Sequence, residues 1–347
     1  MPRRPLVLVV LVVLTASAVA CQSGAPSIAG PAGAGSSPAA ASSGATPANA
    51  TSAGPTLASS NPAALTAAPT GGVLFDDFSY AEVAGLERNG WIVRGHAGWP
   101  GARGAVWSRV AVSFAEDSAR PGNRLARLVA STDGTPRGTV QAQLCQQRKF
   151  REGTYATRIR FHGDPLGGPD GDGVVESFYT ISPLKDMDPA FSELDFEYLP
   201  NGGWGRTGSV LWANSWETAR IEPWFQDNDA TAVDGSMAGW HTLVVQVVDG
   251  TNRFFVDGAL IAEHGGDYYP ESAMSINYNL WFIAAEVLPS TEGRRYADDI
   301  DWVYHEVGVA ISPAQVDARV DGLRAAGSAF SDGVPAWSPP LASPCDL

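Results

Sequence analysis

The sequence predicts an all-β protein built as a β-sandwich. Short runs rich in Val, Ile, Tyr, Phe, Trp and Thr recur from residue 73 onward, and Gly, Pro, Asp and Asn separate them. Several runs alternate apolar and polar residues with a period of two, as a strand with one buried face does. The 347 residues, 44% of them hydrophobic, allow one large globular domain or two small ones.

Residues 1–21 are typical of a secretory signal. Arg3 and Arg4 precede an apolar run that is too short to span a bilayer, and the small residues "TASAVAC" follow it. "AVAC" fits a loose lipobox in which Cys21 is lipidated, whereas "AVA" also fits an ordinary signal-peptidase site. We favour the lipoprotein, and we expect an exported protein at the cell surface or outside the cell.

Residues 22–72 are nearly all Ala, Ser, Gly, Pro and Thr, which predicts a flexible linker without a core of its own. This segment is either a tether behind a lipid anchor or a spacer with no anchor. The formal net charge of the chain is −14, and only Arg3 and Arg4 of its charged residues precede Asp76. The acidic chain from Asp76 onward would repel the phosphate backbone of DNA or RNA, so we expect no nucleic acid partner.

The candidate strands occupy residues 73–309. A hairpin is predicted in "VVDGTNRFFVDG", with Asp249 and Gly250 at its turn. The runs are "RLARLVAST", "GTYATRIRFHG", "GVVESFYTISP", "SELDFEYLP", "GSVLWANSW", "WHTLVVQVVDG", "TNRFFVDGALIAEH", "SINYNLWFIA" and "ADDIDWVYHEVG".

Residues 310–347 carry the one clear helix signal and a Pro-rich tail. Ser312 suits the N-cap of this helix and Pro313 suits its first turn. Gln315 would complete a capping box, and Gly327 is a plausible end of the helix.

Two cysteines remain if Cys21 carries lipid. A disulfide between Cys145 and Cys345 is allowed in an exported protein, and two free thiols are the alternative.

The stretch "FSELDFEYLPN" places Glu193, Asp195 and Glu197 on one face of a strand. A solvated polar face is the ordinary explanation, but three neighbouring carboxylates repel one another without structural gain. Glycoside hydrolysis requires two carboxyl groups, one as nucleophile or base and one as proton donor. Residues four apart on a strand are about 13 Å apart at Cα, and leaning side chains can close this to roughly 5–6 Å, the range for retention.

These residues resemble a known family. "ELDFE", with "YLPN" after it and "GVVESFYTIS" before it, is similar to the ExDxE signature of glycoside hydrolase family 16, in particular lichenases and xyloglucan transglycosylases. The likeness runs from about Val73 to Val309 and includes "WHTLVVQVV", "FFVDG", "NLW" and "DWVYHE" in order. It implies a concanavalin A-like jelly-roll sandwich whose curved concave face is a polysaccharide cleft.

The resemblance also implies roles for the three carboxylates. Glu193 would be the nucleophile, Glu197 the general acid and then base, and Asp195 would tune the nucleophile. The clustered negative charge would raise the pKa of Glu197 and keep it protonated.

In this family, aromatic rings and amide side chains bind the sugar. For each aromatic residue the default alternative is a place in the hydrophobic core. Lichenases carry a Glu and an Arg where this chain has Gln143 and Cys145; Gln143 can bond a sugar hydroxyl, but Cys145 is a poor substitute for Arg. The implied substrate-binding residues are Tyr179, Phe191, Trp212, Asn214, Trp216, Asn279, Trp281 and Gln143.

One metal site is implied, because Asp301 matches an Asp that helps bind a structural Ca²⁺ in relatives. An ordinary exposed Asp on the last strand is the alternative. We expect no cofactor to be required for the chemistry.

The sequence therefore predicts a secreted retaining endo-β-glucanase that acts on β-1,3-1,4- or β-1,3-glucan as a monomer. The alternatives are a transglycosylase on β-glucan or xyloglucan, a non-catalytic glycan-binding sandwich and a structural envelope lipoprotein. A membrane would be reached only through lipid on Cys21.

Overall fold

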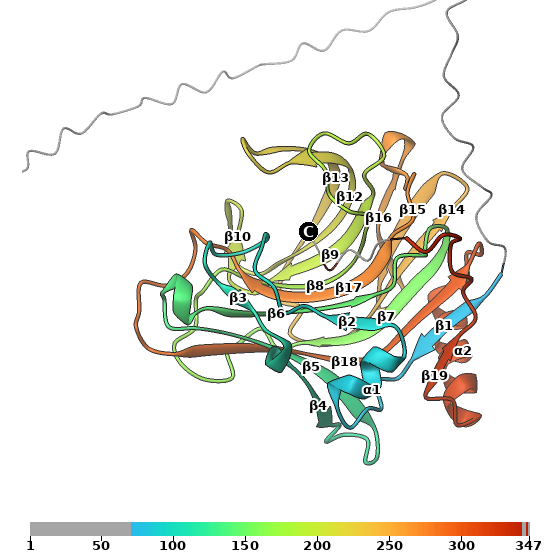
Figure 1. The fold of residues 1–347 in the computed structure, drawn as a ribbon, viewed down its shortest axis with the longest axis horizontal. Helices are drawn as coiled ribbons and strands as arrows, with labels where there is room; N and C mark the ends of the chain where they lie inside the picture. The colour runs from blue at the N-terminus through green and yellow to red at the C-terminus, as the bar shows by residue number, and fades with distance from the viewer. Residues whose placement is uncertain (1–70, 342–344, 346–347) are drawn as a thin grey trace, which may run out of the picture. The chain divides into compact units, whose positions relative to one another are not determined.

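The computed structural model describes residues 71–341 and Cys345. In this part of the chain two mainly antiparallel sheets pack face to face, and one of them curves around an open side (Figure 1). The predicted all-β sandwich is confirmed. The expectations for the signal, the linker to residue 70 and Cys21 lie outside the described residues.

The concave sheet carries the candidate catalytic strand near its middle. Its strands follow the order β2–β6–β17–β8–β9–β12–β13, all antiparallel. Their bounds are β2 (Trp91–Val93), β6 (Val140–Gln146), β8 (Val174–Ile181), β9 (Glu193–Leu199), β12 (Val210–Arg220), β13 (Phe225–Asp234) and β17 (Ser275–Phe282).

The outer sheet is organised around the long strand β18, which pairs with β5, β7 and β1. Strand β4 extends it beyond β5, and β14, β15 and β16 extend it beyond β7, while β19 pairs with β1. The bounds are β1 (Val73–Asp76), β4 (Val112–Glu116), β5 (Arg124–Thr132), β7 (Gly153–Phe161), β14 (Gly239–Val248), β15 (Thr251–Val256), β16 (Ala259–Gly265), β18 (Arg294–Val307) and β19 (Phe330–Asp332).

Short elements complete the described chain. Strand β3 runs parallel to β6, and β10 and β11 form a separate hairpin. The bounds are β3 (Val106–Trp107), β10 (Gly202–Gly203), β11 (Arg206–Thr207), α1 (Val83–Arg88), α2 (Pro313–Ala325), and the 3₁₀ turns η1 (Arg109–Ala111), η2 (Pro136–Gly138) and η3 (Gly266–Tyr268).

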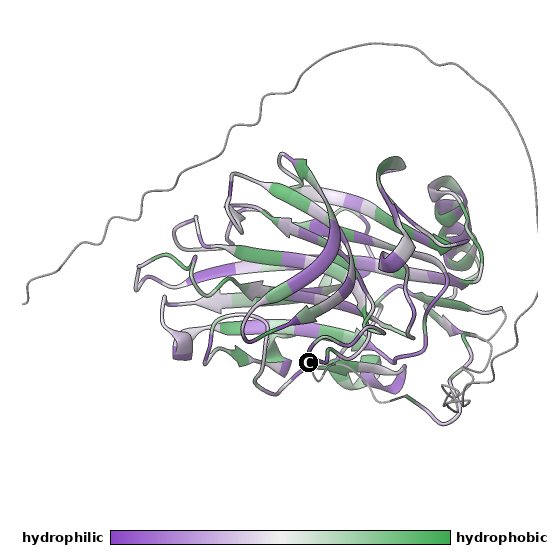
Figure 2. Ribbon diagram, turned by 90° about the horizontal axis from the view of Figure 1, so that it is seen from above, coloured by the Kyte–Doolittle hydropathy of each residue, from purple (hydrophilic) through white to green (hydrophobic). Residues whose placement is uncertain are grey.

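The core lies between the two sheets and follows from the alternation along the strands (Figure 2). On β9, Leu194, Phe196 and Tyr198 point into this core and are almost fully buried. The residues between them must therefore face the concave side. Burial of one face thus determines the direction of the carboxylates.

The predicted hairpin and capped helix are both confirmed. Asp249 and Gly250 join β14 to β15 with positive φ angles of 52° and 74°, which suits a tight hairpin turn. Helix α2 begins after Ser312, whose side chain accepts a hydrogen bond from the Gln315 backbone N–H, while the Gln315 side-chain oxygen accepts one from the Ser312 backbone N–H. None of the described helices is long and apolar enough to span a membrane.

Candidate active site

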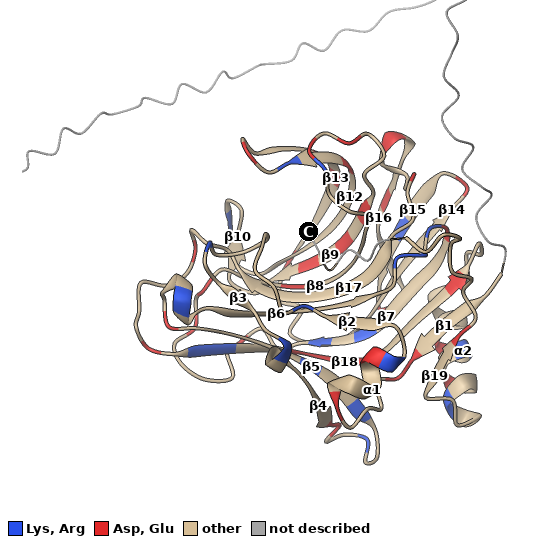
Figure 3. Cartoon of the chain, in the orientation of Figure 1, with Lys and Arg blue, Asp and Glu red and all other residues tan. Residues whose placement is uncertain are grey.

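The candidate catalytic residues lie on the floor of the concave face. Glu193, Asp195 and Glu197 alternate along β9 and line the same cleft, and Figure 3 shows the acidic positions along this strand of the curved sheet. Glu193 and Glu197 are partly exposed, whereas Asp195 is buried. The two glutamates are therefore accessible to a bound molecule, and Asp195 lies beneath it.

Strand β12 supplies the groups that hold Asp195. Asn214 and Trp216 lie opposite Asp195 and Glu193 in the antiparallel register. Asn214 Nδ2 donates to Asp195 Oδ1 (2.5 Å) and Trp216 Nε1 donates to Asp195 Oδ2 (2.8 Å). Asn214 Nδ2 also lies 3.2 Å from Glu197 Oε2, so one amide contacts both carboxylates.

The electrostatics of the stripe favour protonated carboxyls. Burial raises the pKa of Glu193 and of Glu197 well above the usual value, and the charge of Asp195 raises both further. Burial raises the pKa of Asp195 to about 7, although the donors from Asn214 and Trp216 oppose this. Burial and mutual repulsion therefore favour retention of a proton within the group of three, as general acid catalysis requires.

A cleft of about 560 Å³ opens above the stripe. Its lining combines the three carboxylates with six tryptophans, one phenylalanine and several amides. Aromatic faces and amides are the groups that bind a neutral, hydroxyl-rich ligand. Besides the carboxylates, the lining consists of Trp99, Gly101, Leu184, Phe191, Trp204, Trp212, Asn214, Trp216, Ala219, Trp224, Gln226, Asn228, Ala230, Trp281 and Ala284.

The structure separates the predicted sugar-binding residues into two groups. Phe191, Trp212, Asn214, Trp216 and Trp281 line the cleft. They come from β12, from the C-terminal end of β17 and from the segment before β9.

Tyr179, Gln143 and Asn279 are buried beside the cleft and are not part of its lining. They bond to other protein groups: Gln143 Nε2 donates to the Tyr179 hydroxyl (2.8 Å), Arg94 Nη1 donates to Gln143 Oε1 (2.7 Å), and Ser177 donates to Asn279. These protein partners use part of the hydrogen-bonding capacity of the three side chains. In this structure the three residues therefore support the cleft floor.

Comparison with known families agrees with this geometry. The family described as "Glycosyl hydrolases family 16" matches residues 117–304, which is more than half of the chain. The chain belongs to glycoside hydrolase family 16. It is accordingly an enzyme of the endo-acting, retaining kind, and the expected jelly-roll fold and polysaccharide substrate are those of its family.

Solved family 16 structures share this fold at low identity. A Bacteroides ovatus family 16 protein from a mixed linkage glucan PUL, bound to its G4G4G3G product, is 16% identical with a TM-score of 0.51, covering 66% of this chain and 98% of that one. A family 16 endo-glucanase of Bacteroides ovatus gives 16% identity and a TM-score of 0.50 over 66% and 98% of the two chains. The Bacillus licheniformis β-glucanase is 16% identical with a TM-score of 0.49, and the match covers 68% of this chain and 99% of that one. Comparison with curated proteins found no significant match.

Three tryptophans of this family 16 enzyme were not predicted from the sequence. Trp99, Trp204 and Trp224 line the cleft from loops and are 37%, 44% and 51% exposed. Their signal is a large aromatic residue in a Gly- or Pro-rich turn: "GWPG", "GGWGR" and "EPWF". Trp204 also adopts φ 51°, a backbone conformation that is unfavourable for a bulky residue.

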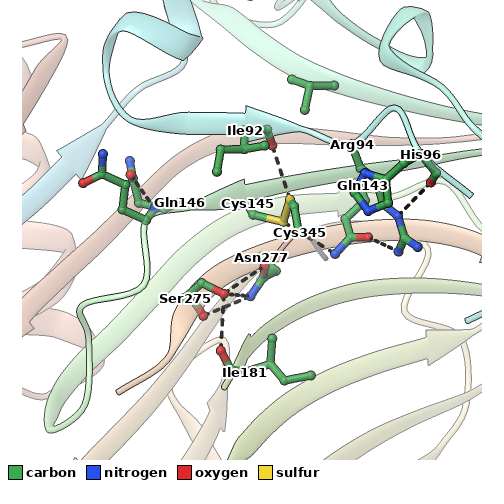
Figure 4. The surroundings of a disulfide bond; sticks show 12 residues. Ile92, Arg94, His96, Gln143, Cys145, Gln146, Ile181, Ser275, Asn277 and Cys345 are labelled. Atoms are coloured by element: carbon green, nitrogen blue, oxygen red, sulfur yellow. Dashed lines mark hydrogen bonds between the residues drawn. A yellow bond between two sulfur atoms is a disulfide. The ribbon is translucent and has the colours of Figure 1, made fainter. Parts of the chain in front are cut away.

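Cys145, on β6 of the concave sheet, and Cys345 form a disulfide (Figure 4). Their Cα atoms are 6.0 Å apart, and 200 residues separate them in sequence. Cys145 lies opposite Asn277 on β17, and Asn277 lies opposite Tyr179. Cys145, which stands where lichenases have an Arg, therefore links Cys345 to strand β6 of the concave sheet.

Asp301, the implied calcium ligand, is surrounded by cationic donors. Its carboxylate accepts from Arg324 Nη2 (2.7 Å), Arg158 Nη1 (3.0 Å) and Asn123 Nδ2 (2.8 Å), and Arg120 lies at 3.5 Å. This set of donors does not suit a cation. Among residues 71–341 and Cys345, no group of three or more His, Cys, Asp or Glu could hold a metal ion.

Proposed function

We propose that this family 16 enzyme hydrolyses β-1,3-1,4- or β-1,3-glucan by double displacement, as a secreted endo-β-glucanase. The observation that carries the proposal is the position of Glu193, Asp195 and Glu197 on one strand face at the base of an aromatic cleft. The carboxylates account for the reaction, and the cleft accounts for a carbohydrate ligand.

In the first step the Glu193 carboxylate attacks the anomeric carbon and the bond to the leaving sugar breaks. Glu197 gives its proton to the leaving oxygen, and the burial and neighbouring charges that raise its pKa favour this protonated form. Esterification removes the charge of Glu193, so the pKa of Glu197 falls. Glu197 can then take a proton from water, whose oxygen displaces Glu193 and leaves the sugar with its original configuration.

The composition of the cleft favours a neutral polysaccharide. Within the described residues that line it there is no Lys or Arg, whereas a sulfated glycan would require cationic partners. The nearby Arg206 stacks on Trp212 and pairs with Asp234. A β-glucan therefore fits the lining better than a carrageenan does.

The test is reducing-sugar release from barley β-glucan, laminarin, xyloglucan, agarose and carrageenan. We expect release from at least one of the first two, none from carrageenan, and none with the matched variant Glu193→Ala. Release by Glu193→Ala at the wild-type rate, or no release from any glycan by the wild type, would contradict the proposal. A labelled oligosaccharide acceptor distinguishes hydrolysis from transglycosylation, because only transfer extends the labelled sugar.

We also propose that the enzyme is exported and carries lipid on Cys21. The signal-like residues 1–21 and a disulfide, which persists in oxidising compartments, support export. Labelled fatty acid should be incorporated into the wild type but not into a Cys21→Ser variant. Equal labelling of both proteins, or no labelling of either, would contradict lipid attachment at Cys21.

A further inference from the structure

Two exposed tryptophans meet across the cleft. Trp99 lies in the loop that follows β2, and Trp224 lies in the turn between β12 and β13. In the concave sheet β6, β17, β8 and β9 lie between β2 and β12. The two rings nevertheless have centroids 6.2 Å apart and planes 31° apart, so the two sides of the curved sheet meet above the strands between them.

The contact lies close to the catalytic carboxylates. Trp224 packs edge-on against Trp216 at 6.4 Å, and Trp216 Nε1 bonds Asp195. Trp99 and Trp224 both line the cleft that contains Glu193 and Glu197. A continuous path of rings therefore runs from Asp195 to the opposite side of the cleft.

Buried groups hold the loop that carries Trp99. Both terminal nitrogens of Arg94 donate to the Trp99 carbonyl (3.1 and 3.2 Å), and Arg94 stacks on Trp107 at 4.4 Å. Trp107 Nε1 in turn donates to the Gly98 carbonyl (3.0 Å). Arg94 and Trp107 are almost fully buried, so the loop is fixed from below.

Gly101 keeps this loop close to the sheet. Its φ is +100°, and a Cβ at this position would lie 2.2 Å from Oε1 of the buried Gln141. Only glycine combines this backbone angle with so close an approach. The close approach of the loop at Gly101 therefore helps to fix the position of Trp99.

Both rings remain partly exposed, which leaves apolar surface in water. Stacking on the apolar face of a sugar would cover that surface. The arrangement suits a chain passing between the ring pair and the carboxylates.

We propose that Trp99 and Trp224 form a bridge over the catalytic carboxylates that encloses a polysaccharide chain, so that the enzyme makes several cuts before it releases the chain. This inference rests on the proposed hydrolysis of a polysaccharide. In an open cleft the polymer leaves as soon as its sugar contacts break. Under a bridge the rings must also separate, which slows release relative to movement along the chain.

The experiment follows the viscosity of barley β-glucan against reducing ends formed. The wild type should form about 2–10-fold more reducing ends for a given loss of viscosity than Trp224→Ala or Trp99→Ala, the range that an aromatic contact supplies. Trp224→Phe keeps a ring and should restore much of the wild-type behaviour. Trp240→Ala removes a tryptophan that stacks on Arg158 outside the cleft and should follow the wild-type curve.

Superimposed curves for wild type, Trp224→Ala and Trp99→Ala would overturn the bridge while leaving the proposed hydrolysis intact. An inactive wild type would overturn both. If an alanine variant is inactive, dissociation from immobilised β-glucan decides the matter, because it needs no catalysis: Glu193→Gln alone is compared with Glu193→Gln combined with Trp224→Ala. Equal release rates there would also refute the bridge, whereas faster release from the variant would support it.

Discussion

Asp195 differs from the glutamates on either side of it because β12 occupies both of its oxygens. Asn214 and Trp216 hold the carboxylate in one orientation, and their donors stabilise its charged form against burial. When Asp195 is ionised, its negative charge is therefore held at a fixed position beside Glu193 and Glu197. This arrangement gives a physical reason for three acids on one strand.

Glu197→Gln should separate proton donation from nucleophilic attack. We expect hydrolysis of β-glucan to fall about 10²–10⁴-fold, because the leaving oxygen loses its acid. Cleavage of an aryl glycoside with a good leaving group should fall less in its first step, since that group needs no proton. Pre-steady-state release of the aryl group measures this, and equal losses on both substrates would contradict the assigned role.

The row of three acids could be predicted from sequence, because residues two apart on a strand point to the same face of the sheet. The aromatic lining could be predicted only in part, since Phe191, Trp212 and Trp216 lie on or beside strands whose faces can be counted. Trp99 and Trp224 lie in loops, where no periodicity indicates a direction. Their contact depends on the curvature of the whole sheet.

Two elements, β8 and β18, place a second pair of acids between the sheets. Glu176 and Asp298 are fully buried, and as carboxylates both oxygens of Glu176 and Oδ1 of Asp298 lack a partner. A proton on either side chain would allow one hydrogen bond between them, which two charged carboxylates cannot form. Burial raises the pKa of Glu176 to about 7 and that of Asp298 well above the usual range.

This pair should make the fold less stable as pH rises. A carboxyl whose pKa is raised by folding stabilises the protein fully below its unfolded pKa of 4.5 and loses that contribution as pH rises through about 7. The loss is on the order of 3 kcal/mol for Glu176, or about 5–10 °C in Tm. Glu176→Gln should therefore show a smaller fall in Tm between pH 5 and 8 than the wild type.

The control is Glu292→Gln, which removes an exposed carboxyl and should follow the wild type. An unchanged pH dependence in Glu176→Gln would show that the pair is not the titrating element.

Helix α2 is attached to the outer sheet through Arg324 and Asp301. Because Asp301 is satisfied by arginines and Asn123, a chelator should leave Tm unchanged. Differential scanning calorimetry with and without EDTA tests this. A fall in Tm that added Ca²⁺ reverses would restore the calcium site that the resemblance implies.

The helices differ in how well sequence could predict them. Helix α2 has a cap, a proline and a thirteen-residue span, so local rules were sufficient. Helix α1 was not predicted, because six residues are too few for a periodic signal and Glu82 provides no side-chain cap. Packing of Leu86 in the core accounts for it instead.

At the scale of the whole molecule, the disulfide joins the concave sheet to a residue near the end of the chain. A cross-link closing a loop of 200 residues restricts the unfolded chain, and we expect Cys145→Ser with Cys345→Ser to lower stability by about 2–5 kcal/mol. Thermal unfolding of the two proteins measures this. Equal Tm values would mean that the bond contributes nothing to the fold.

The central claim is that Glu193 forms the covalent intermediate of a retaining glycosidase. The most direct measurement is mass spectrometry of peptides from enzyme treated with an activated 2-fluoro β-gluco-oligosaccharide, which slows hydrolysis of the intermediate. We predict one glycosyl group attached to Glu193. Label on Glu197 or Asp195, or turnover of β-glucan without a label that can be trapped on Glu193, would contradict the claim.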